Sequence, residues 1–313
     1  MSPLSEAFLE RLKQIIPDEQ WQSILNSFER PKCVSFRVNP LKASSGRVLN
    51  ELAGKGFLIR PVVWYDAAFI LTRGTLRGLQ ETNAYQRGEI YLQELSSMIP
   101  VLVLDPQPEQ TVLDLTAAPG SKTTQIAGLM QNTGTLMAND ASRLRFFKLK
   151  ANLESQGVRN TVLSQIPGEN FGRHYPEYFD RVLLDAPCSG EGRFHLAEPE
   201  SYQGWKTAKL KSLVPRQKML FYAAFHALKP GGILVYSTCT FAPEENEGIL
   251  DWAAEKFGSA LEIQDIKPAI SHTQRGLGSW KKKIYHPAVQ KGLRVLPNEM
   301  MEGFFVAKMK KVA

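Results

Sequence analysis

The chain has 313 residues, of which 43% are hydrophobic, so it is long enough to bury one large domain and a smaller one. Its formal charge of +7 favours a polyanionic partner, although a merely basic soluble protein would show the same excess. The three cysteines, Cys33, Cys188 and Cys239, are widely spaced, which argues against both a disulfide framework and a metal site. No signal pattern begins the chain, and no run approaches the ~20 apolar residues of a spanning helix. We therefore expect a soluble cytoplasmic protein without a metal.

The first 95 residues have the pattern of a small mixed domain. Residues 5–16 predict a helix with Ser5 as N-cap, because apolar residues recur there at helical spacing and Pro17 ends the run. Strand-like runs then follow at residues 33–38, 57–59, 62–65 and 69–71. We therefore predict an N-terminal α+β domain over residues 1–95.

From Thr111 the rhythm changes to strand, tight loop and helix. Val112–Leu115 predicts an apolar strand, and Ala117–Gly120 a turn into a helix that begins near Ser121. Further strand-like runs lie at residues 134–138, 161–164, 181–184 and 233–236. This order predicts an α/β domain over residues 96–313, with a mostly parallel, doubly wound sheet and helices on both faces. Gly292–Val295 and Gly303–Lys308 predict two late strands that pair antiparallel at the sheet edge.

Ligands of doubly wound sheets bind outside the carboxyl ends of the strands, which directs attention to the loop Thr116–Lys122. The loop has small residues but lacks both G-x-G-x-x-G and the P-loop pattern, so it disfavours a nicotinamide or a nucleoside triphosphate. Helix amides at Ser121 and Lys122 are suited instead to a carboxylate. Asp140 follows the second strand at a spacing where an acid binds a ribose diol, although the same position equally suits a helix N-cap.

Two cysteines follow two later strands. Asp185 and Cys188 come after one strand and Cys239 after the next, so both thiols face one cleft if the strands are neighbours. The alternative is a pair of buried structural cysteines. A thiolate that adds to C6 of a pyrimidine makes C5 nucleophilic, which is the chemistry that methyl transfer to this carbon requires. Lys122 is the cation expected beside the thiol, and Asp185 the acid at the N3 and amino edge of the base.

Several ordered motifs resemble the Nol1/Nop2/Sun family of RNA cytosine-C5 methyltransferases, and in particular its bacterial 16S ribosomal RNA members. The principal matches are Ala117-Ala118-Pro119-Gly120-Ser121-Lys122-Thr123, Asp185-Ala186-Pro187-Cys188-Ser189-Gly190-Glu191-Gly192, Ser237-Thr238-Cys239-Thr240 and Pro243-Glu244-Glu245-Asn246-Glu247. Further matches are Phe36-Arg37-Val38-Asn39-Pro40-Leu41-Lys42, Gln93-Glu94-Leu95-Ser96-Ser97 and Glu302-Gly303-Phe304-Phe305. The resemblance thus covers nearly the whole chain.

The resemblance implies a Rossmann-like sheet that binds S-adenosylmethionine (SAM), an N-terminal RNA-binding domain and a monomer. Cys239 would be the nucleophile, and Cys188 would assist product release, with Asp185 and Lys122 completing the catalytic set. DNA cytosine methyltransferases use the thiol of the Pro-Cys motif instead, so the residues alone leave the two roles open. The implied cofactor contacts are Thr116, Ala117, Ala118, Pro119, Gly120, Ser121, Lys122, Asp140, Arg145 and Asp185. The substrate would be ribosomal RNA, with transfer RNA as the alternative.

One departure from the family pattern concerns the adenine of the cofactor. Pro167 stands where related enzymes usually carry an Asp, and proline offers neither a side-chain acceptor nor a backbone donor. That contact is lost, passed to a neighbour such as Glu169, or left to water. This departure favours a second hypothesis, a non-catalytic RNA-binding assembly factor, against which the two cysteines argue. An amino-group methyltransferase is a third, disfavoured because Asp185-Ala186-Pro187-Cys188 lacks its usual motif.

Two basic segments are candidates for RNA contact. A phosphate-binding helix face and a solvated one are equally consistent with Lys206, Lys209, Lys211, Arg216 and Lys218. The stretch from Trp280 to His286 combines aromatic and basic residues, the composition with which proteins stack on bases and bind phosphates.

Overall fold

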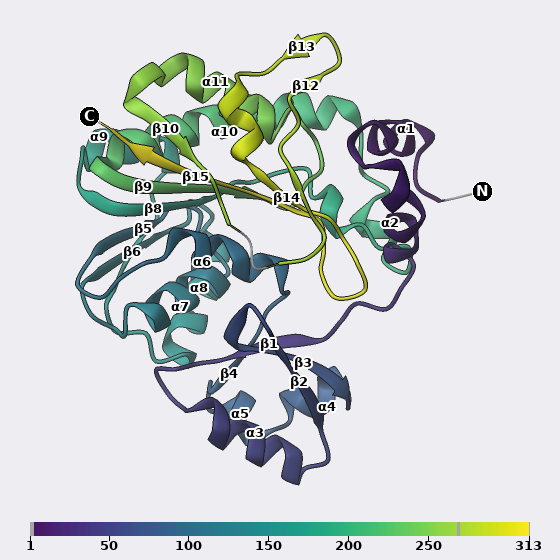
Figure 1. Ribbon diagram of the computed structural model, residues 1–313. Helices are drawn as coiled ribbons and strands as arrows, with labels where there is room; N and C mark the ends of the chain where they lie inside the picture. The colour runs from purple at the N-terminus through teal and green to yellow at the C-terminus, as the bar shows by residue number, and fades with distance from the viewer. Residues whose placement is uncertain (1–2, 268–269, 313) are drawn as a thin grey trace.

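The computed structural model describes residues 3–267 and 270–312, and its largest element is a nine-stranded sheet (Figure 1). Five of its strands are parallel neighbours in the order β9, β8, β5, β6 and β7. Their bounds are Thr111–Asp114 (β5), Thr135–Asn139 (β6), Thr161–Ser164 (β7), Phe179–Asp185 (β8) and Leu228–Thr238 (β9). The chain order reverses between β6 and β8 on the two sides of β5, so the carboxyl ends of these strands form the crevice that doubly wound sheets use for ligands.

The other side of the sheet is antiparallel. β15 pairs with β9, and β14 and β10 both pair with β15, while β11 pairs with β14. The bounds are Leu261–Gln264 (β10), Thr273–Arg275 (β11), Leu293–Val295 (β14) and Phe304–Lys311 (β15). The antiparallel pairing expected of the two late strands is confirmed. β15 is longer than expected and lies inside the sheet rather than at its edge, because β10, β11 and β14 continue the sheet beyond it.

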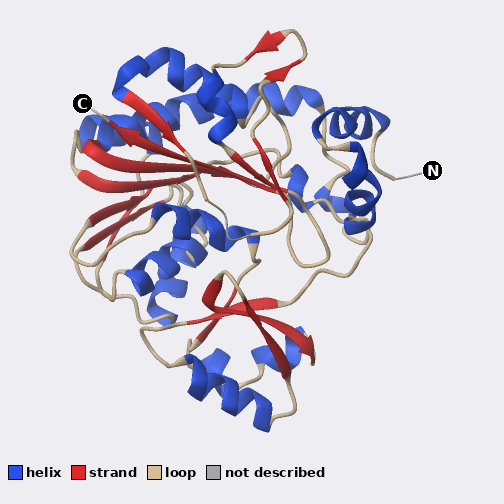
Figure 2. Ribbon diagram, viewed as in Figure 1, coloured by secondary structure: helices blue, strands red, loops and turns tan. Residues whose placement is uncertain are grey.

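Helices cover both faces of this sheet, as Figure 2 shows, which confirms the expected fold class. Adjacent strand residues point to opposite faces, so Leu183 packs with Ile126 on one face while Leu184 packs with Phe221 on the other. The first face carries α6 (Ile99–Leu104), α7 (Ser121–Leu129) and α8 (Arg143–Ser155). The second face carries α9 (Phe171–His174), α10 (Thr207–Ala227) and α11 (Glu247–Phe257).

A separate four-stranded antiparallel sheet, in the order β2-β3-β1-β4, has a hydrophobic cluster of its own. Its strands are β1 (Ser35–Val38), β2 (Leu58–Val62), β3 (Tyr65–Arg73) and β4 (Ile90–Leu92), and its helices are α3 (Ser45–Gly54), α4 (Leu76–Gln80) and α5 (Asn83–Gln86). The prediction of a strand over residues 62–65 was wrong. These residues hold the turn between β2 and β3, where Val63 is 92% exposed and no sheet covers its side chain.

The first two helices pack away from this small sheet. α1 (Glu6–Ile15) begins at the expected N-cap, Ser5, whose hydroxyl accepts a hydrogen bond from the amide of Phe8. With α2 (Trp21–Ser27), it packs against the large sheet domain (Figure 1). The Phe8 ring lies 4.9 Å from that of Phe194. The division at residue 95 stays a prediction. Across residues 3–267 and 270–312, no helix is both long and apolar enough to cross a bilayer.

Candidate active site

A cavity of about 670 Å³ opens at the carboxyl ends of β5, β6, β8 and β9. That volume lies within the range of small-molecule sites. Its lining includes these residues expected from the sequence: Thr116, Ala118, Asp140, Arg145, Asp185, Cys188 and Cys239. The remaining expected residues form the loop and the first turn of α7 behind the cavity: Ala117, Pro119, Gly120, Ser121 and Lys122. The lining also contains two cations that were not expected from the sequence, Lys32 and Arg193.

The two thiols are brought together by the parallel pairing of β8 and β9. Asp185 at the end of β8 lies opposite Ser237 near the end of β9, so the residues that follow each strand meet. The sulfur atoms of Cys188 and Cys239 are 3.3 Å apart, and both cysteines are free. A second contact, 2.7 Å between the hydroxyls of Ser189 and Thr240, holds the same two loops together. The sequence-based expectation that both thiols face one cleft is thus met.

The surroundings of Cys188 keep its proton in place. The hydrogen bond with Cys239 raises the pKa of the Cys188 thiol well above its ordinary value, and burial and the charges of Glu245 and Asp185 add to the effect. Either sulfur could donate in the 3.3 Å contact, and the raised pKa of Cys188 favours the arrangement in which Cys188 donates its S–H to Cys239. With the proton on Cys188, the sulfur of Cys239 is the acceptor of the pair.

Lys122 contacts the acid of the site rather than a thiol. Its ammonium group lies 2.7 Å from Asp185 Oδ2 and 2.8 Å from the hydroxyl of Ser97, and its side chain is buried against the ring of Phe304. The other oxygen of Asp185 accepts a hydrogen bond of 2.8 Å from Ser237. Lys122 was expected beside the nucleophile; the structure instead shows it orienting Asp185, because α7 presents its first turn to the end of β8.

Asp140 closes the opposite side of the cavity, directly after β6. Its carboxylate accepts hydrogen bonds from the amides of Ala118 (3.3 Å) and Ser142 (3.0 Å), and Arg145 lies 3.2 Å away. Ser142 is the N-cap residue of α8, so Asp140 closes a turn two residues before the helix and is not the N-cap that was the alternative for this position. A carboxylate has about four acceptor positions, so at least one remains for a ligand hydroxyl.

The position of Pro167 is at the edge of the same cavity. Pro167 precedes a short helical turn, Gly168–Asn170, and Gly168 lines the cavity. The neighbour considered as a replacement for the missing acid, Glu169, forms an ion pair of 3.4 Å with Arg216. Its carboxylate is thus already engaged with a cation.

Comparison with known proteins places this geometry in a family. Residues 101–310 match the family model of the 16S rRNA methyltransferase RsmB/F, and residues 4–95 match that of the N-terminal domain of 16S rRNA methyltransferase RsmF. The chain belongs to the RsmB/F family. Ribosomal RNA small subunit methyltransferase F of Vibrio campbellii is 40% identical over 99% of this chain, and that of Salmonella arizonae is 38% identical over 98%. The chain spans about 63% of the length of these curated relatives.

Solved structures agree with the fold of this RsmB/F family member. A methyltransferase homolog protein from Pyrococcus horikoshii is 33% identical, with a TM-score of 0.83 over 98% of this chain and 100% of its own. The structure of NSun6 from Pyrococcus horikoshii with SFG is 24% identical, with a TM-score of 0.82 over 99% of this chain and 98% of its own, and shows the fold alone.

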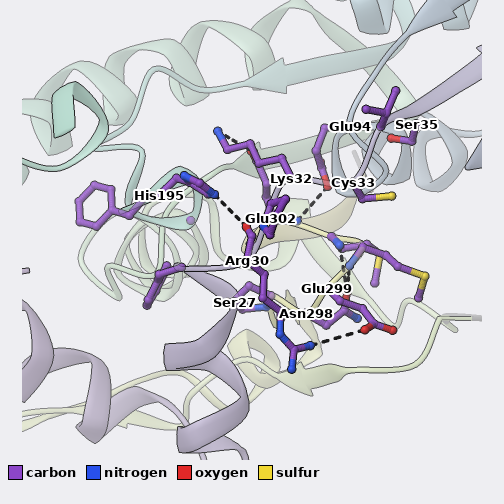
Figure 3. A pocket seen from close by; sticks show the side chains of 18 of the residues that line it. Ser27, Arg30, Lys32, Cys33, Ser35, Glu94, His195, Asn298, Glu299 and Glu302 are labelled. Atoms are coloured by element: carbon purple, nitrogen blue, oxygen red, sulfur yellow. Dashed lines mark hydrogen bonds and ion pairs between the residues drawn. The ribbon is translucent and has the colours of Figure 1, made fainter. Parts of the chain in front are cut away.

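A second cavity, of about 420 Å³, adjoins the first in this RsmB/F family member (Figure 3). Lys32 and Glu198 line both cavities and lie 2.9 Å apart. Lys32 also lies 3.5 Å from Glu302, and Arg30 pairs with Glu299 at 3.5 Å (Figure 3). Most of the wall consists of loops brought together from distant parts of the chain, so no local pattern in the sequence indicates this cavity.

The basic segments expected to contact RNA have different outcomes. Trp280 and Tyr285 are buried, and the indole N–H of Trp280 donates to Glu244 at 3.0 Å while Arg11 covers its ring. These rings are not free to stack on bases, so the expected stacking was wrong, whereas phosphate contact by the exposed lysines of this stretch stays a prediction. Of the expected basic residues around α10, Arg216 lines the first cavity.

Proposed function

We propose that this RsmB/F family member is a SAM-dependent RNA (cytosine-C5)-methyltransferase that acts on 16S ribosomal RNA in the cytoplasm. The observation that carries the proposal is the pair of sulfur atoms 3.3 Å apart beside Asp185, in a cavity that Asp140 closes on its other side. An amino-group methyltransferase needs no thiol, whereas C5 of cytosine requires one. The names of the curated relatives favour small-subunit ribosomal RNA over transfer RNA.

The cavity fits SAM in size and in donor chemistry. Asp140 retains an acceptor for a ribose hydroxyl, and its charge, with that of Asp185, suits a cationic ligand. The small residues of the loop 116–122 and Arg145 would hold the remainder of the molecule. When bound, SAM would supply an electrophilic methyl group.

The residues of the chain carry the remaining steps. The thiolate of Cys239 adds to C6 of the cytosine, forming an S–C6 bond and placing electron density at C5. Asp185, held by Lys122 and Ser237, contacts the N3 and amino edge of the ring and passes to N3 the proton that neutralises the charge developing there. After C5 has gained the methyl group, a water molecule removes the C5 proton, and the S–C6 bond breaks to restore the double bond. Cys188 donates its S–H to the departing sulfur of Cys239.

RNA engagement is assigned to both parts of the chain. The target base must leave its stack to reach the cavity, so most of the affinity comes from phosphate contacts outside it. We assign these contacts to the N-terminal region, residues 1–95, and to the exposed basic residues around α10 (Lys206, Lys209 and Lys211). No metal and no second copy of the chain take part in this proposal.

A methyl-transfer assay tests the proposal. The protein is incubated with labelled SAM and with 16S ribosomal RNA, free or in small subunits that lack the modification, and bisulfite sequencing then maps the labelled cytosines. Transfer RNA is the alternative substrate, and Cys239→Ala is the control. We expect SAM-dependent 5-methylcytosine in 16S ribosomal RNA only. Methylation of transfer RNA alone would replace the substrate, and RNA binding without transfer to either RNA would favour the assembly factor.

A further inference from the structure

A free cysteine thiol titrates near pKa ~8.5, so a nucleophilic cysteine at neutral pH needs a nearby positive charge. The lining of the cavity around Cys239 is negatively charged, which disfavours a thiolate. Four carboxylates line it, those of Asp140, Asp185, Glu198 and Glu200, and each opposes a second negative charge. At least one cation must therefore be directed toward the sulfur atoms.

Most cations in or beside the cavity are committed to carboxylates. Lys122 lies 2.7 Å from Asp185, and Lys32 lies 2.9 Å from Glu198. Arg145 contacts Asp140 at 3.2 Å, and Arg216 contacts Glu169 at 3.4 Å. An ion pair offsets much of the charge that each cation presents to a third group. These four cations are thus poorly suited to stabilise the thiolate.

Arg193 differs from them. Its nearest carboxylate, Glu302, is 3.8 Å away, and Lys32 shares that carboxylate from 3.5 Å (Figure 3). Within residues 3–267 and 270–312, its guanidinium has no hydrogen bond to a carboxylate. Its side chain is 64% exposed, and it lines the same cavity as both sulfur atoms. Its charge is thus the least compensated of the cations in that lining.

The backbone fixes Arg193 beside the nucleophile. The preceding residue, Gly192, donates its amide to the carbonyl of Cys239 at 2.9 Å and accepts from the amide of Gly303 at 3.0 Å. A Cβ atom at Gly192 would lie 2.0 Å from the carbonyl oxygen of Gly303, so the close approach requires glycine here. The amide of Arg193 also closes the turn onto Gly190 at 3.0 Å.

The charge interaction agrees with this placement. Partial desolvation opposes the charged form of Arg193, but electrostatic attraction, first to Cys239 and then to Glu302, raises the pKa of its guanidinium above the ordinary value. The interaction is mutual, so the same guanidinium favours the thiolate form of its cysteine partners. Cys188 is held protonated by Cys239 and by the charges of Glu245 and Asp185. The charge of Arg193 therefore acts on the thiolate of Cys239.

We propose that Arg193 is the positioned cation that stabilises the thiolate of Cys239 for attack on the base, the role that the sequence pattern had suggested for Lys122. The inference deepens the proposed function and rests on it for its catalytic meaning. Its test does not, because a thiolate reacts with an alkylating reagent whether or not RNA or SAM is present.

The test is the pH profile of Cys239 alkylation. Iodoacetamide is added between pH 6 and pH 10, a range that brackets the ordinary thiol pKa, and mass spectrometry quantifies each cysteine peptide separately. The variants are Arg193→Met, Arg193→Lys and, as the matched control in the adjoining cavity, Arg30→Met, whose guanidinium pairs with Glu299. Arg193→Gln serves as a second neutral variant, and thermal unfolding and SAM binding check that each variant is folded.

For Arg193→Met we expect the midpoint of the profile to move upward and the rate at pH 7 to fall about three- to tenfold, a range that allows for solvent screening of a partly exposed charge. The plateau rate at high pH stays at the wild-type value, because a lost charge changes the thiolate fraction and not access to the sulfur. Arg193→Lys retains most of the effect, and Arg30→Met leaves the profile unchanged. A wild-type midpoint in both neutral variants would overturn the proposal, as would a lowered plateau with an unmoved midpoint. A normal shift without methyl transfer would refute the proposed function alone.

Discussion

The ends of β8 and β9 carry the same functional group in different electrostatic surroundings. Cys188 follows β8 and lies near Asp185 and Glu245, which favour its protonated form. Cys239 follows β9, and its backbone is bonded to the residue that precedes Arg193. We therefore assign the two thiols, only 3.3 Å apart, to different tasks, one to hold a proton and one to carry charge. The difference teaches that the role of a cysteine is set by the charges around it and not by the motif in which it occurs.

The largest expected effect comes from removing the charged member of the pair. Cys239→Ala should lower methyl transfer by at least about a thousandfold, because the thiolate is required to activate the ring. SAM binding should remain within a few-fold of the wild-type value, since no cofactor contact is assigned to this sulfur. Rates come from the labelled-methyl assay and affinities from calorimetry. Normal turnover in this variant would break the comparison between the two strand ends.

Removing the protonated member should have the opposite signature. Cys188→Ala deprives the departing Cys239 sulfur of its S–H donor, so turnover should fall by about ten- to a hundredfold, the range typical of a proton-transfer partner. Protein should then accumulate on RNA as a covalent complex that survives denaturing electrophoresis and requires SAM.

The reverse assignment makes a different forecast. If Cys188 is the nucleophile, the complex will form with Cys239→Ala and be absent with Cys188→Ala. The variant that lacks both thiols serves as the control and should form none in either case. This experiment resolves the alternative that the motifs alone left open.

The sequence indicated the two thiols and Asp140 because the ends of strands can be recognised in a sequence. Apolar runs mark the strands, and the carboxyl ends of parallel strands meet at one edge of a sheet, as Cys188 and Cys239 do. Contacts made by loops and helix starts are set by tertiary packing, which periodicity does not encode. For that reason the partner of Lys122 and the position of Arg193 were not foreseen.

The same limit explains other errors. Trp280 is followed in the sequence by lysines, which predicts an exposed side chain. In the structure it is covered by Arg11 and Glu244, which are distant in sequence. The packing of Phe8 against Phe194 likewise joins segments that no local pattern connects. Helix α1 itself was predicted closely, because its N-cap and its apolar face are local features.

A pH-dependent effect sharpens the comparison further. Burial raises the pKa of Glu191, which follows the Cys188 motif, to about 7, against hydrogen bonds from Trp205 and Thr240 that lower it. A folded pKa above the unfolded value means that its contribution to stability is full below about pH 4.5 and is lost as pH rises to about 7. Glu191→Gln should therefore gain stability relative to wild type across this window, by up to about 3 kcal/mol.

Urea unfolding at several pH values measures that gain. Groups that titrate in both proteins contribute equally to the two free energies of unfolding. The difference between these free energies therefore reports on Glu191 alone. Glu200→Gln, an exposed carboxylate of the same loop, is the matched control and should give a flat difference. A flat difference for Glu191→Gln as well would show that this carboxylate is not held protonated beside the thiol loops.

A further variant separates the thiol side of the cavity from its cofactor side. Asp140→Ala removes a carboxylate that accepts from Ala118 and Ser142 and is assigned to a ribose hydroxyl, so SAM binding should weaken by about 1–3 kcal/mol. The midpoint of Cys239 alkylation should move to slightly lower pH, opposite in direction to Arg193→Met, because one of the four carboxylates that oppose a thiolate in this cavity is lost. Glu169→Ala is the control: its carboxylate pairs with Arg216, so SAM should bind as before unless Glu169 replaces the acid missing at Pro167. An unchanged dissociation constant in Asp140→Ala would remove this residue from the cofactor site while leaving the assignment of the two thiols intact.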